Sequence, residues 1–219
     1  VLFLGGLFLY KTKKMDLAGI IGCAGVFSVF FGFIIGILLA LARMAKGNPL
    51  KTAIRWLATA YVEFIRGTPM MVQVMFVYFG LGLFVNLPAL TSGIIAISLN
   101  SGAYVAEYIR GGINSVDVGQ TEAARSLGMS NGETMRYVVL PQALKNIWPS
   151  LGNEFITLIK DSSIVSIIGV TELIYQSNIV RSDTYRGVAP IVVIMVLYFI
   201  LTFTASRILN YFERRMQHD

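Results

Sequence analysis

The sequence has very little cysteine, histidine or charge. Its 219 residues include one cysteine, Cys23, and one histidine, His218. A single cysteine excludes an internal disulfide, and a single histidine excludes a histidine-rich metal site and most histidine-based catalysis. Charged residues make up 14% of the chain, against roughly 25% in a typical soluble domain. A disordered chain and a secreted disulfide scaffold are therefore excluded.

Hydrophobic residues are abundant instead, and they gather in long runs. They make up 55% of the chain and give a mean hydropathy of +0.68. The charge-free run 17–42 is long enough for a helix to cross a bilayer core of about 30 Å. No long alternating strand pattern appears, so membrane-spanning segments must be helices. We predict five such helices, near residues 17–42, 68–85, 89–109, 147–169 and 187–209.

Two of these predictions need a separate argument. The charge-free stretch 67–106 is too long for one helix, so we predict a turn at residues 86–88, where a proline disrupts the helix. The fourth helix carries Glu154, Lys160 and Asp161. A charge inside a span is costly and usually faces a partner or a polar cavity, so these residues are candidates for function.

The excess of basic residues predicts the orientation in the membrane. Lysine and arginine outnumber aspartate and glutamate 18 to 12, a formal net charge of +6. The basic residues follow the first and third predicted helices and occupy the C-terminal tail, as in cytoplasmic segments. We therefore expect no nucleic-acid partner, an N-terminus outside and a C-terminus in the cytoplasm. Residues 1–16 do not fit an N-terminus outside, because they carry three lysines. We expect this segment to be the truncated end of an earlier helix or fused domain.

The segment between the third and fourth predicted helices is longer than an ordinary loop. We predict a cytoplasmic hairpin of two short helices over residues 117–141. Gly128 ends the first helix, since a left-handed backbone is least costly for glycine. Ser130 or Asn131 caps the second helix, and Pro141 interrupts it.

The hairpin contains a motif of fixed spacing. The run Glu122-Ala123-Ala124, then Gly128, then Val138-x-Leu140-Pro141 resembles the EAA motif of ABC-importer permeases, with valine in place of the usual isoleucine. Further stretches resemble the branch of that family that imports polar amino acids of the histidine, glutamine and arginine type; they are residues 63–69, 99–113, 152–155, 159–163 and 213–216.

The resemblance covers residues 17–216 and implies an all-α integral membrane protein. It implies a type I importer permease core of five transmembrane helices, with cytoplasmic coupling helices, in a bacterial inner membrane. The implied partners are an ATP-binding cassette ATPase dimer, a second permease copy, identical or different, and an extracytoplasmic binding protein that delivers the amino acid. The chain has no G-x-x-x-x-G-K-[ST] phosphate loop, so we expect no enzymatic activity and no cofactor in it, with ATP and magnesium bound by the ATPase.

The resemblance also assigns roles in the hairpin. It implies that contact with the ATPase involves Glu122, Ala123, Ala124, Gly128, Leu140 and Pro141. Two of these roles have simpler alternatives. Glu122 either pairs with a basic residue of the ATPase or stabilises its own helix dipole. Gly128 either forms the sharp turn between coupling helices or ends a helix, and both roles require glycine.

The polar residues inside the predicted spans are candidates for binding the substrate. Glu154 and Asp161 are seven residues apart, so they lie on one helix face; they bind the substrate, or they pair with Lys160 or the partner permease. Asn100 either contacts the substrate or forms an interhelical hydrogen bond. Gln73 and Ser162 are weaker candidates. Glu107 and Arg110, at i and i+3, are expected to form a structural ion pair.

Two alternative functions remain, an ATP-independent channel and an intramembrane enzyme. An enzyme would need clustered histidines, paired carboxylates with a metal ligand, or an activated nucleophile. The sequence has no such pattern beyond Glu154 and Asp161, and we predict no metal site. The resemblance implies instead the membrane-spanning permease of an ATP-driven polar amino acid importer, and this is the predicted function.

Overall fold

The computed structural model describes residues 16–45 and 47–218, and this part of the chain is helical and contains no strand. The α-helices are α2 (Asp16–Met44), α3 (Pro49–Gly67), α4 (Met70–Met75), α5 (Ala89–Asn114), α6 (Val118–Ser126), α7 (Asn131–Glu133), α8 (Leu140–Asp161), α9 (Leu173–Thr184) and α10 (Ala189–His218). The π-helical segments are η1 (Phe76–Gly80) and η3 (Thr134–Val139), and the 3-10 segments are η2 (Leu81–Leu83) and η4 (Ser162–Ile168).

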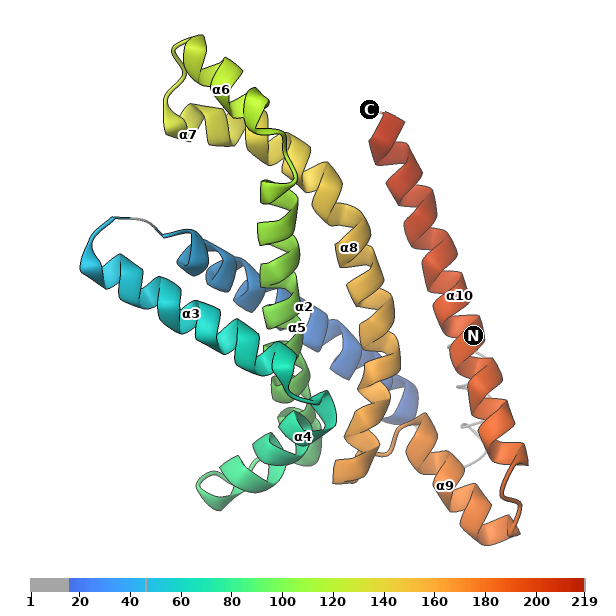
Figure 1. Cartoon of the computed structure of the whole chain (residues 1–219). Coiled ribbons are helices and arrows are strands. Elements are labelled where there is room, and N and C mark those ends of the chain that lie inside the picture. Colours follow the sequence, from blue (N-terminus) through green and yellow to red (C-terminus); the bar gives the residue numbers. More distant parts are fainter. Residues whose placement is uncertain (1–15, 46, 219) are drawn as a thin grey trace.

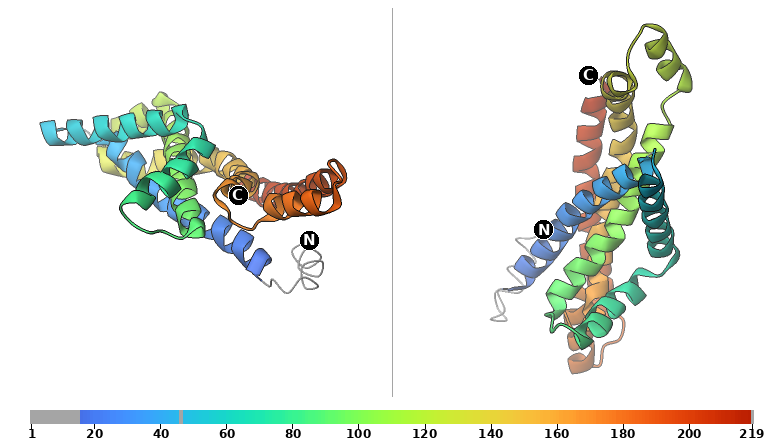
Figure 2. Two further views of the ribbon diagram at one scale, coloured as in Figure 1. Left: turned by 90° about the horizontal axis from the view of Figure 1, so that it is seen from below. Right: turned by 90° about the vertical axis from the view of Figure 1, so that its left-hand side faces the viewer.

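The long helices α5 and α8 pack against each other at the centre of the molecule (Figure 1). Helices α2 and α3 contact α5, whereas α10 contacts α8. The hairpin of α6 and α7 and the C-terminal end of α10 lie at one end, and α4 and α9 lie at the other (Figures 1 and 2). The hairpin is therefore separated from the α4 and α9 end by the length of the bundle.

The contact between α2 and α5 depends on small residues. A Cβ atom added to Gly36 would lie 2.4 Å from the Val105 Cγ1 atom, and one added to Gly32 would lie 2.9 Å from the Ser101 Cβ atom. Membrane helices associate through close van der Waals contact, which small residues permit. The Gly32-x-x-x-Gly36 spacing thus sets how closely α2 approaches α5.

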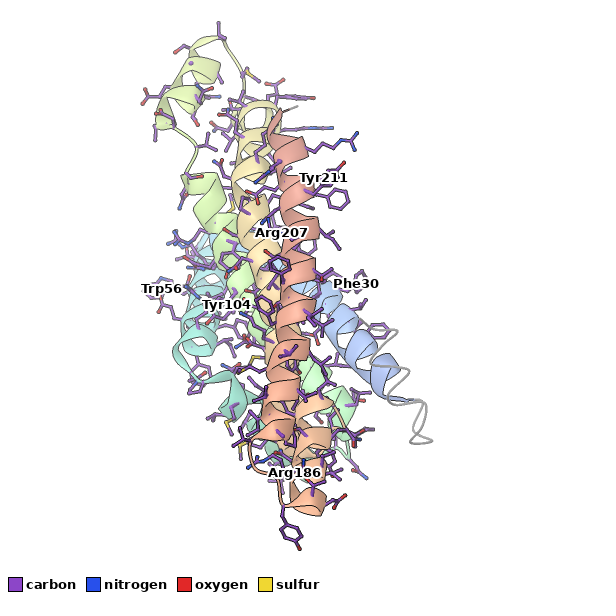
Figure 3. The ribbon with its side chains drawn as sticks, turned by 90° about the vertical axis from the view of Figure 1, so that its right-hand side faces the viewer. Phe30, Trp56, Tyr104, Arg186, Arg207 and Tyr211 are labelled. Atoms are coloured by element: carbon purple, nitrogen blue, oxygen red, sulfur yellow. The ribbon has the colours of Figure 1, made fainter. Side chains whose placement is uncertain are left out.

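Three helices of the described residues are long and apolar enough to cross a membrane: Gly25–Met44, Ala89–Asn114 and Ala189–Arg215. Two bent helix pairs reach the same criterion together, which gives up to five spans. The first pair joins α3 to residues 70–83 with a bend of 108°, and the second joins residues 131–168 to α9 with a bend of 52°. Large apolar side chains are exposed on α2, α3 and α10; Figure 3 shows Phe30, Trp56 and Tyr211 among them.

The second predicted helix differs most from the structure. We expected a basic loop before a helix over 68–85, but the chain forms helix α3 there, and the helical segment after the bend covers only residues 70–83. The Asn48 side chain accepts a hydrogen bond from the Lys51 backbone N–H, and Pro49 occupies the first turn, so the start of α3 is well capped. The charges of α3 lower its hydropathy without lowering its helix propensity.

The prediction that Pro141 interrupts the hairpin helix is wrong. Helix α8 begins at Leu140, directly after the π-helical segment η3, so it starts seven residues before the predicted 147. Proline is tolerated in a first helical turn because its missing N–H is not needed there. Helix α8 ends at Asp161 and continues as the 3-10 segment η4. The fifth predicted helix, 187–209, lies mostly within α10, and residues 1–15 of the predicted N-terminal segment lie outside the described residues.

Candidate functional site

The most buried carboxylate of α8, Glu154, faces α5. Its residue is 7% exposed, and the Tyr108 hydroxyl donates a hydrogen bond to its Oε2 atom at 3.1 Å. The Ser101 side chain, also on α5, is a further polar neighbour of the Glu154 carboxylate. Asp161 follows two turns later and is partly buried. The structure thus places two carboxylates on α8, and the aromatic and hydroxyl groups of α5 contact the first.

Two further candidates, Asn100 and Gln73, contact each other. The Asn100 side-chain amide donates a hydrogen bond to the Gln73 Oε1 atom at 2.9 Å. The Gln73 amide in turn donates to the Ile65 carbonyl at 2.7 Å and to the Thr68 hydroxyl at 2.8 Å. The last carbonyls of a helix lack intrahelical partners, so Gln73 satisfies the end of α3 at the 108° bend.

The interhelical hydrogen bond considered for Asn100 is therefore present. Asn100 and Ser101 are consecutive residues of α5, and they connect the Gln73 group to the Glu154 group. Ser162 differs from these residues, since its hydroxyl donates to the Ile159 carbonyl at 2.8 Å within its own helix end. Gln73, Asn100 and Glu154 thus lie at the contacts of α5 with the α3–α4 bend and with α8, whereas no hydrogen bond within the described residues joins Asp161 or Ser162 to them.

An ion cluster surrounds Glu107, the residue that precedes Tyr108 on α5. Glu107 pairs with Arg110, as predicted, and its Oε2 atom also lies 2.5 Å from Arg43 and 3.8 Å from Arg66. The Arg66 guanidinium carbon lies 5.3 Å from the centre of the Tyr104 ring. We call Arg43, Arg66, Glu107 and Arg110 the Glu107 cluster. The sequence did not predict that Arg43 and Arg66 pair with Glu107, although each lies in the last turn of its helix.

The hairpin has the turn at Gly128 and the cap at Ser130 that its sequence predicts, whereas its second helix is not interrupted at Pro141. The Asp117 side chain caps α6 by accepting from the Gly119 N–H, and Ser130 and Glu133 form a reciprocal capping box. The hydrogen bonds from Ser130 hold the pKa of Glu133 below its ordinary value. Gly128 has a φ of 89°, so the predicted left-handed turn is confirmed.

Within the EAA motif, only Ala124 is buried, at 4% exposure. Glu122 lies in the second turn of α6 and is exposed, so it does not cap the helix. Leu127 is 84% exposed and Leu140 39% exposed. The hairpin therefore presents a carboxylate and apolar side chains to its surroundings, as a surface for a partner does.

A second buried glutamate was not predicted. Glu172 is 2% exposed and caps α9, where its Oε1 atom accepts from the Tyr175 N–H at 2.7 Å. The Tyr198 hydroxyl of α10 donates to its other oxygen at 3.2 Å. The only sequence signal for this cap was the position of Glu172, directly before the apolar start of a helix.

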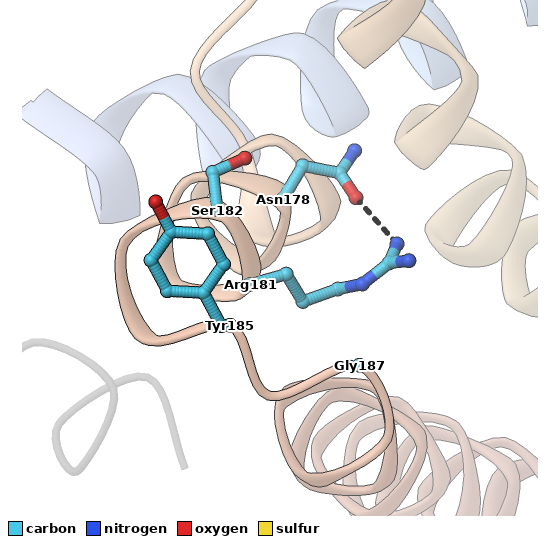
Figure 4. Close-up of a pocket in the computed structure, with 5 residues that line it drawn as sticks. All are labelled: Asn178, Arg181, Ser182, Tyr185 and Gly187. Atoms are coloured by element: carbon cyan, nitrogen blue, oxygen red, sulfur yellow. Dashed lines mark hydrogen bonds between the residues drawn. The ribbon is translucent and has the colours of Figure 1, made fainter.

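A cavity of about 310 Å³ lies at the turn from α9 to α10, lined by Asn178, Arg181, Ser182, Tyr185 and Gly187 (Figure 4). Arg181 donates a hydrogen bond to the Asn178 side chain at 3.2 Å, within α9. None of the predicted site residues lines this cavity. Among the described residues, no group of three or more His, Cys, Asp and Glu side chains could hold a metal ion.

Two bent helix pairs and long helices with exposed apolar side chains define a helical membrane protein. Residues 32–218 match the family described as "binding-protein-dependent transport system inner membrane component". The chain belongs to this family. It is a permease component of an ABC importer, in which a separate subunit hydrolyses ATP, and both an ATPase and a binding protein are implied as partners.

Curated relatives cover most of the chain. It is 42% identical over 193 residues to the putative glutamine transport system permease protein GlnP of Rickettsia bellii, covering 87% of each chain. It is 39% identical over 196 residues to the arginine transport system permease protein ArtQ of Bacillus subtilis, covering 89% of this chain and 88% of that one.

Solved structures agree with the fold. A crystal structure of an amino acid ABC transporter with histidines is similar at a TM-score of 0.85 and 45% identity, over 96% of this chain and 98% of that one. The inward-facing MetNI methionine ABC transporter is similar at a TM-score of 0.75 and 19% identity. The second likeness shows the type I importer fold alone.

Proposed function

We propose that this permease, a component of an amino acid ABC importer, moves a polar amino acid past the Glu154 and Asp161 side chains of α8. Relatives named for glutamine and arginine, and a structural neighbour described with histidines, support a polar substrate. The observation that carries the proposal is the buried Glu154 carboxylate at the α5–α8 contact. A buried ionisable group in a membrane helix is costly, and such groups commonly face a ligand path.

In this proposal the two carboxylates of α8 bind the ammonium group or a basic side chain of the amino acid. Asn100, Gln73 and Ser162 contribute polar contacts when the helices move, although in this structure their amides and hydroxyl bond to protein groups. Lys160 is exposed beside Asp161, so the local charge is not purely negative. A zwitterionic or cationic amino acid suits this arrangement better than an acidic one.

Energy enters through the hairpin in this proposal. The exposed Glu122, with the left-handed turn at Gly128 and the apolar Leu140 and Pro141, contacts an ATP-binding cassette ATPase that binds ATP and magnesium. Ala123 and Ala124 permit close packing, and Ala124 is already buried within the hairpin. Movement of the hairpin then swings α5 and α8 between inward-facing and outward-facing states.

The assembly contains two permease copies in a bacterial inner membrane, with the hairpin and the C-terminal end of α10 in the cytoplasm. The binding protein then docks at the opposite end, where α4 and α9 lie. The basic residues of the hairpin and of α10 support this orientation, because cytoplasmic segments are enriched in lysine and arginine. No observation favours an ATP-independent channel or an intramembrane enzyme.

The test is reconstitution of the permease in proteoliposomes with its ATPase inside and its binding protein outside. We expect uptake of labelled glutamine, arginine or histidine that requires both ATP and the binding protein. Vesicles that lack ATP and vesicles with an ATPase unable to hydrolyse ATP are the controls. Uptake that persists without ATP would overturn the proposal in favour of a channel.

A further inference from the structure

Helix α10 has one side that packs on the bundle and one side directed away from it. The Tyr198 hydroxyl donates a hydrogen bond to Glu172. The Leu209 side chain lies 3.7 Å from the position of a Cβ atom added to Gly152 of α8. Tyr198 and Leu209 therefore mark the packed side. Arg207 follows Tyr198 by nine residues, which is about two and a half turns, so it lies on the opposite side of the helix.

A single stripe on this outward side combines apolar, aromatic and basic side chains. Its spacings of three and four residues keep it on one face of the helix; it consists of Val196, Ile200, Phe203, Arg207, Tyr211 and Arg214. All of these residues are exposed. The Arg207 guanidinium carbon lies 4.9 Å from the centre of the Phe203 ring, so the basic and apolar parts of the stripe are in contact. Arg207 and Tyr211 lie on the helix nearest the viewer in Figure 3.

The charge pattern of α10 places this stripe in the membrane. The charge-free part of the helix, residues 189–206, is about 27 Å long, close to the thickness of a bilayer core of about 30 Å. Arg207 therefore lies at an edge of the core. Tyr211 and Arg214 follow about 6 and 10 Å further along the axis, at the depth of the headgroups. Phe203 and the apolar residues before it lie at the depth of the acyl chains.

The described residues do not balance the positive charge of the stripe. Arg207 and Arg214 form no salt bridge within the described part of the chain. Glu213, the one carboxylate of α10, follows Leu209 by four residues and so lies on the packed side. A second permease copy would bring its own basic cytoplasmic segments to this side of the membrane, and like charges repel. An anion from the bilayer suits the stripe better.

We propose that the stripe of α10 binds an anionic phospholipid. Arg207 and Arg214 donate hydrogen bonds to the phosphate oxygens, and the Tyr211 hydroxyl lies between them. The acyl chains lie along Phe203 and the apolar residues that precede it in the stripe. Basic groups at the cytoplasmic end of a membrane helix attract anionic headgroups. The inference rests on the proposed function only for the choice of the cytoplasmic leaflet.

The first test is native mass spectrometry of the transporter, released from nanodiscs that contain phosphatidylcholine and phosphatidylglycerol in equal amounts. We expect the wild-type transporter to retain phosphatidylglycerol preferentially. The Arg207→Gln/Arg214→Gln variant should lose that preference. A basic residue near an anionic surface contributes roughly fivefold, so the expected loss is about 25-fold for the two arginines.

The matched control is Lys51→Gln/Arg55→Gln, which removes the same charge from α3. Neither residue belongs to the stripe or forms a salt bridge within the described part of the chain, so general electrostatic attraction changes equally in both variants. Equal loss of phosphatidylglycerol from both variants would overturn the proposal. Displacement of the retained lipid by millimolar inorganic phosphate would overturn it as well, because the site would then select free phosphate.

The second test locates the lipid on the helix. Phosphatidylglycerol with a photoreactive diazirine in its acyl chain should label residues 196–203 in the wild-type transporter and much less in Arg207→Gln/Arg214→Gln. A second copy that covers this face would leave these residues unlabelled, and that result would contradict the proposal. Neither test uses ATP, an amino acid or a binding protein, so a failure of the proposed transport function leaves both interpretable.

Discussion

Tyr108 on α5 donates its hydroxyl hydrogen bond to Glu154 on α8 across 3.1 Å. The two residues lie 46 positions apart, so the bond joins the third and fourth long helices at the depth of the candidate site. Because Glu154 accepts a hydrogen bond from the Tyr108 hydroxyl, its Oε2 atom is directed toward α5. The bond thus fixes the Glu154 carboxylate at the α5–α8 contact, where we propose that it meets a substrate ammonium group.

Removal of the Glu154 charge is predicted to weaken substrate binding. Glu154→Gln keeps the shape of the side chain but not its charge, so the KM for uptake should rise about tenfold or more, because a charge-assisted hydrogen bond contributes roughly 1.5–3 kcal/mol. Asp161→Asn should have a similar but smaller effect. The exposed carboxylate Glu63 on α3 provides the control, Glu63→Gln. Unchanged uptake kinetics in both α8 variants would remove them from the substrate path.

The left-handed turn of the hairpin is predicted to be needed for coupling. Gly128 has a φ of 89° and no atom within 4 Å of an added Cβ, so Gly128→Ala fits in space but is strained by roughly 1–2 kcal/mol. Uptake per ATP hydrolysed should fall in Gly128→Ala and recover in part in Gly128→Asn, since asparagine tolerates the left-handed region.

The control for this prediction is Gly132→Ala. Gly132 lies in α7 with an ordinary backbone and equally open space. It therefore tests the effect of an added methyl group on the hairpin without the strain. A Gly128→Ala transporter with the same uptake per ATP as the Gly132→Ala transporter would contradict a role for the turn geometry.

The bond between Gln73 and Asn100 separates two interpretations of both residues. If they are structural, Gln73→Leu should lower stability by about 1–3 kcal/mol, since the buried Asn100 amide and the end of α3 lose their partner. The KM should then stay unchanged. Thermal unfolding and uptake are measured on Gln73→Leu, on Asn100→Leu and on the double variant Gln73→Leu/Asn100→Leu. A KM that rises in a variant of unchanged stability would assign the pair to substrate binding instead.

The sequence predicts those features that depend on a few neighbouring residues. The pair of Glu107 with Arg110 is three residues apart, and the turn at Gly128 and the helix cap, expected at Ser130 or Asn131 and found at Ser130, follow local backbone rules. Each of these predictions concerns residues within one or two turns of the chain. The structure confirms them for that reason.

Contacts between distant segments could not be predicted in the same way. Arg43 and Glu107 are 64 residues apart, so their ion pair depends on how α2 packs on α5 through Gly32 and Gly36. Helix α3 was hidden because its charges lower hydropathy, the property that located the other helices. Pro141 was misread since the preceding π-helical segment lets a new helical register begin at Leu140.

The Glu172–Tyr198 contact is predicted to hold α9 against α10. Glu172→Ala removes the cap of α9, a loss of about 0.5–2 kcal/mol, and also leaves the hydroxyl of the partly buried Tyr198 without its carboxylate acceptor. Tyr198→Phe removes only the hydroxyl and should cost about 1 kcal/mol. Glu172→Ala should therefore lower the thermal unfolding temperature of the detergent-purified transporter more than Tyr198→Phe does.

The double variant measures whether the two groups act together. If the carboxylate and the hydroxyl stabilise each other, the loss in Glu172→Ala/Tyr198→Phe should be smaller than the sum of the single losses, because the second substitution removes a hydroxyl that has already lost its acceptor. Strictly additive losses would mean that Glu172 acts only as the cap of α9. The same measurement after Glu63→Gln, an exposed carboxylate of α3, should give no change beyond the error, since that side chain caps no helix.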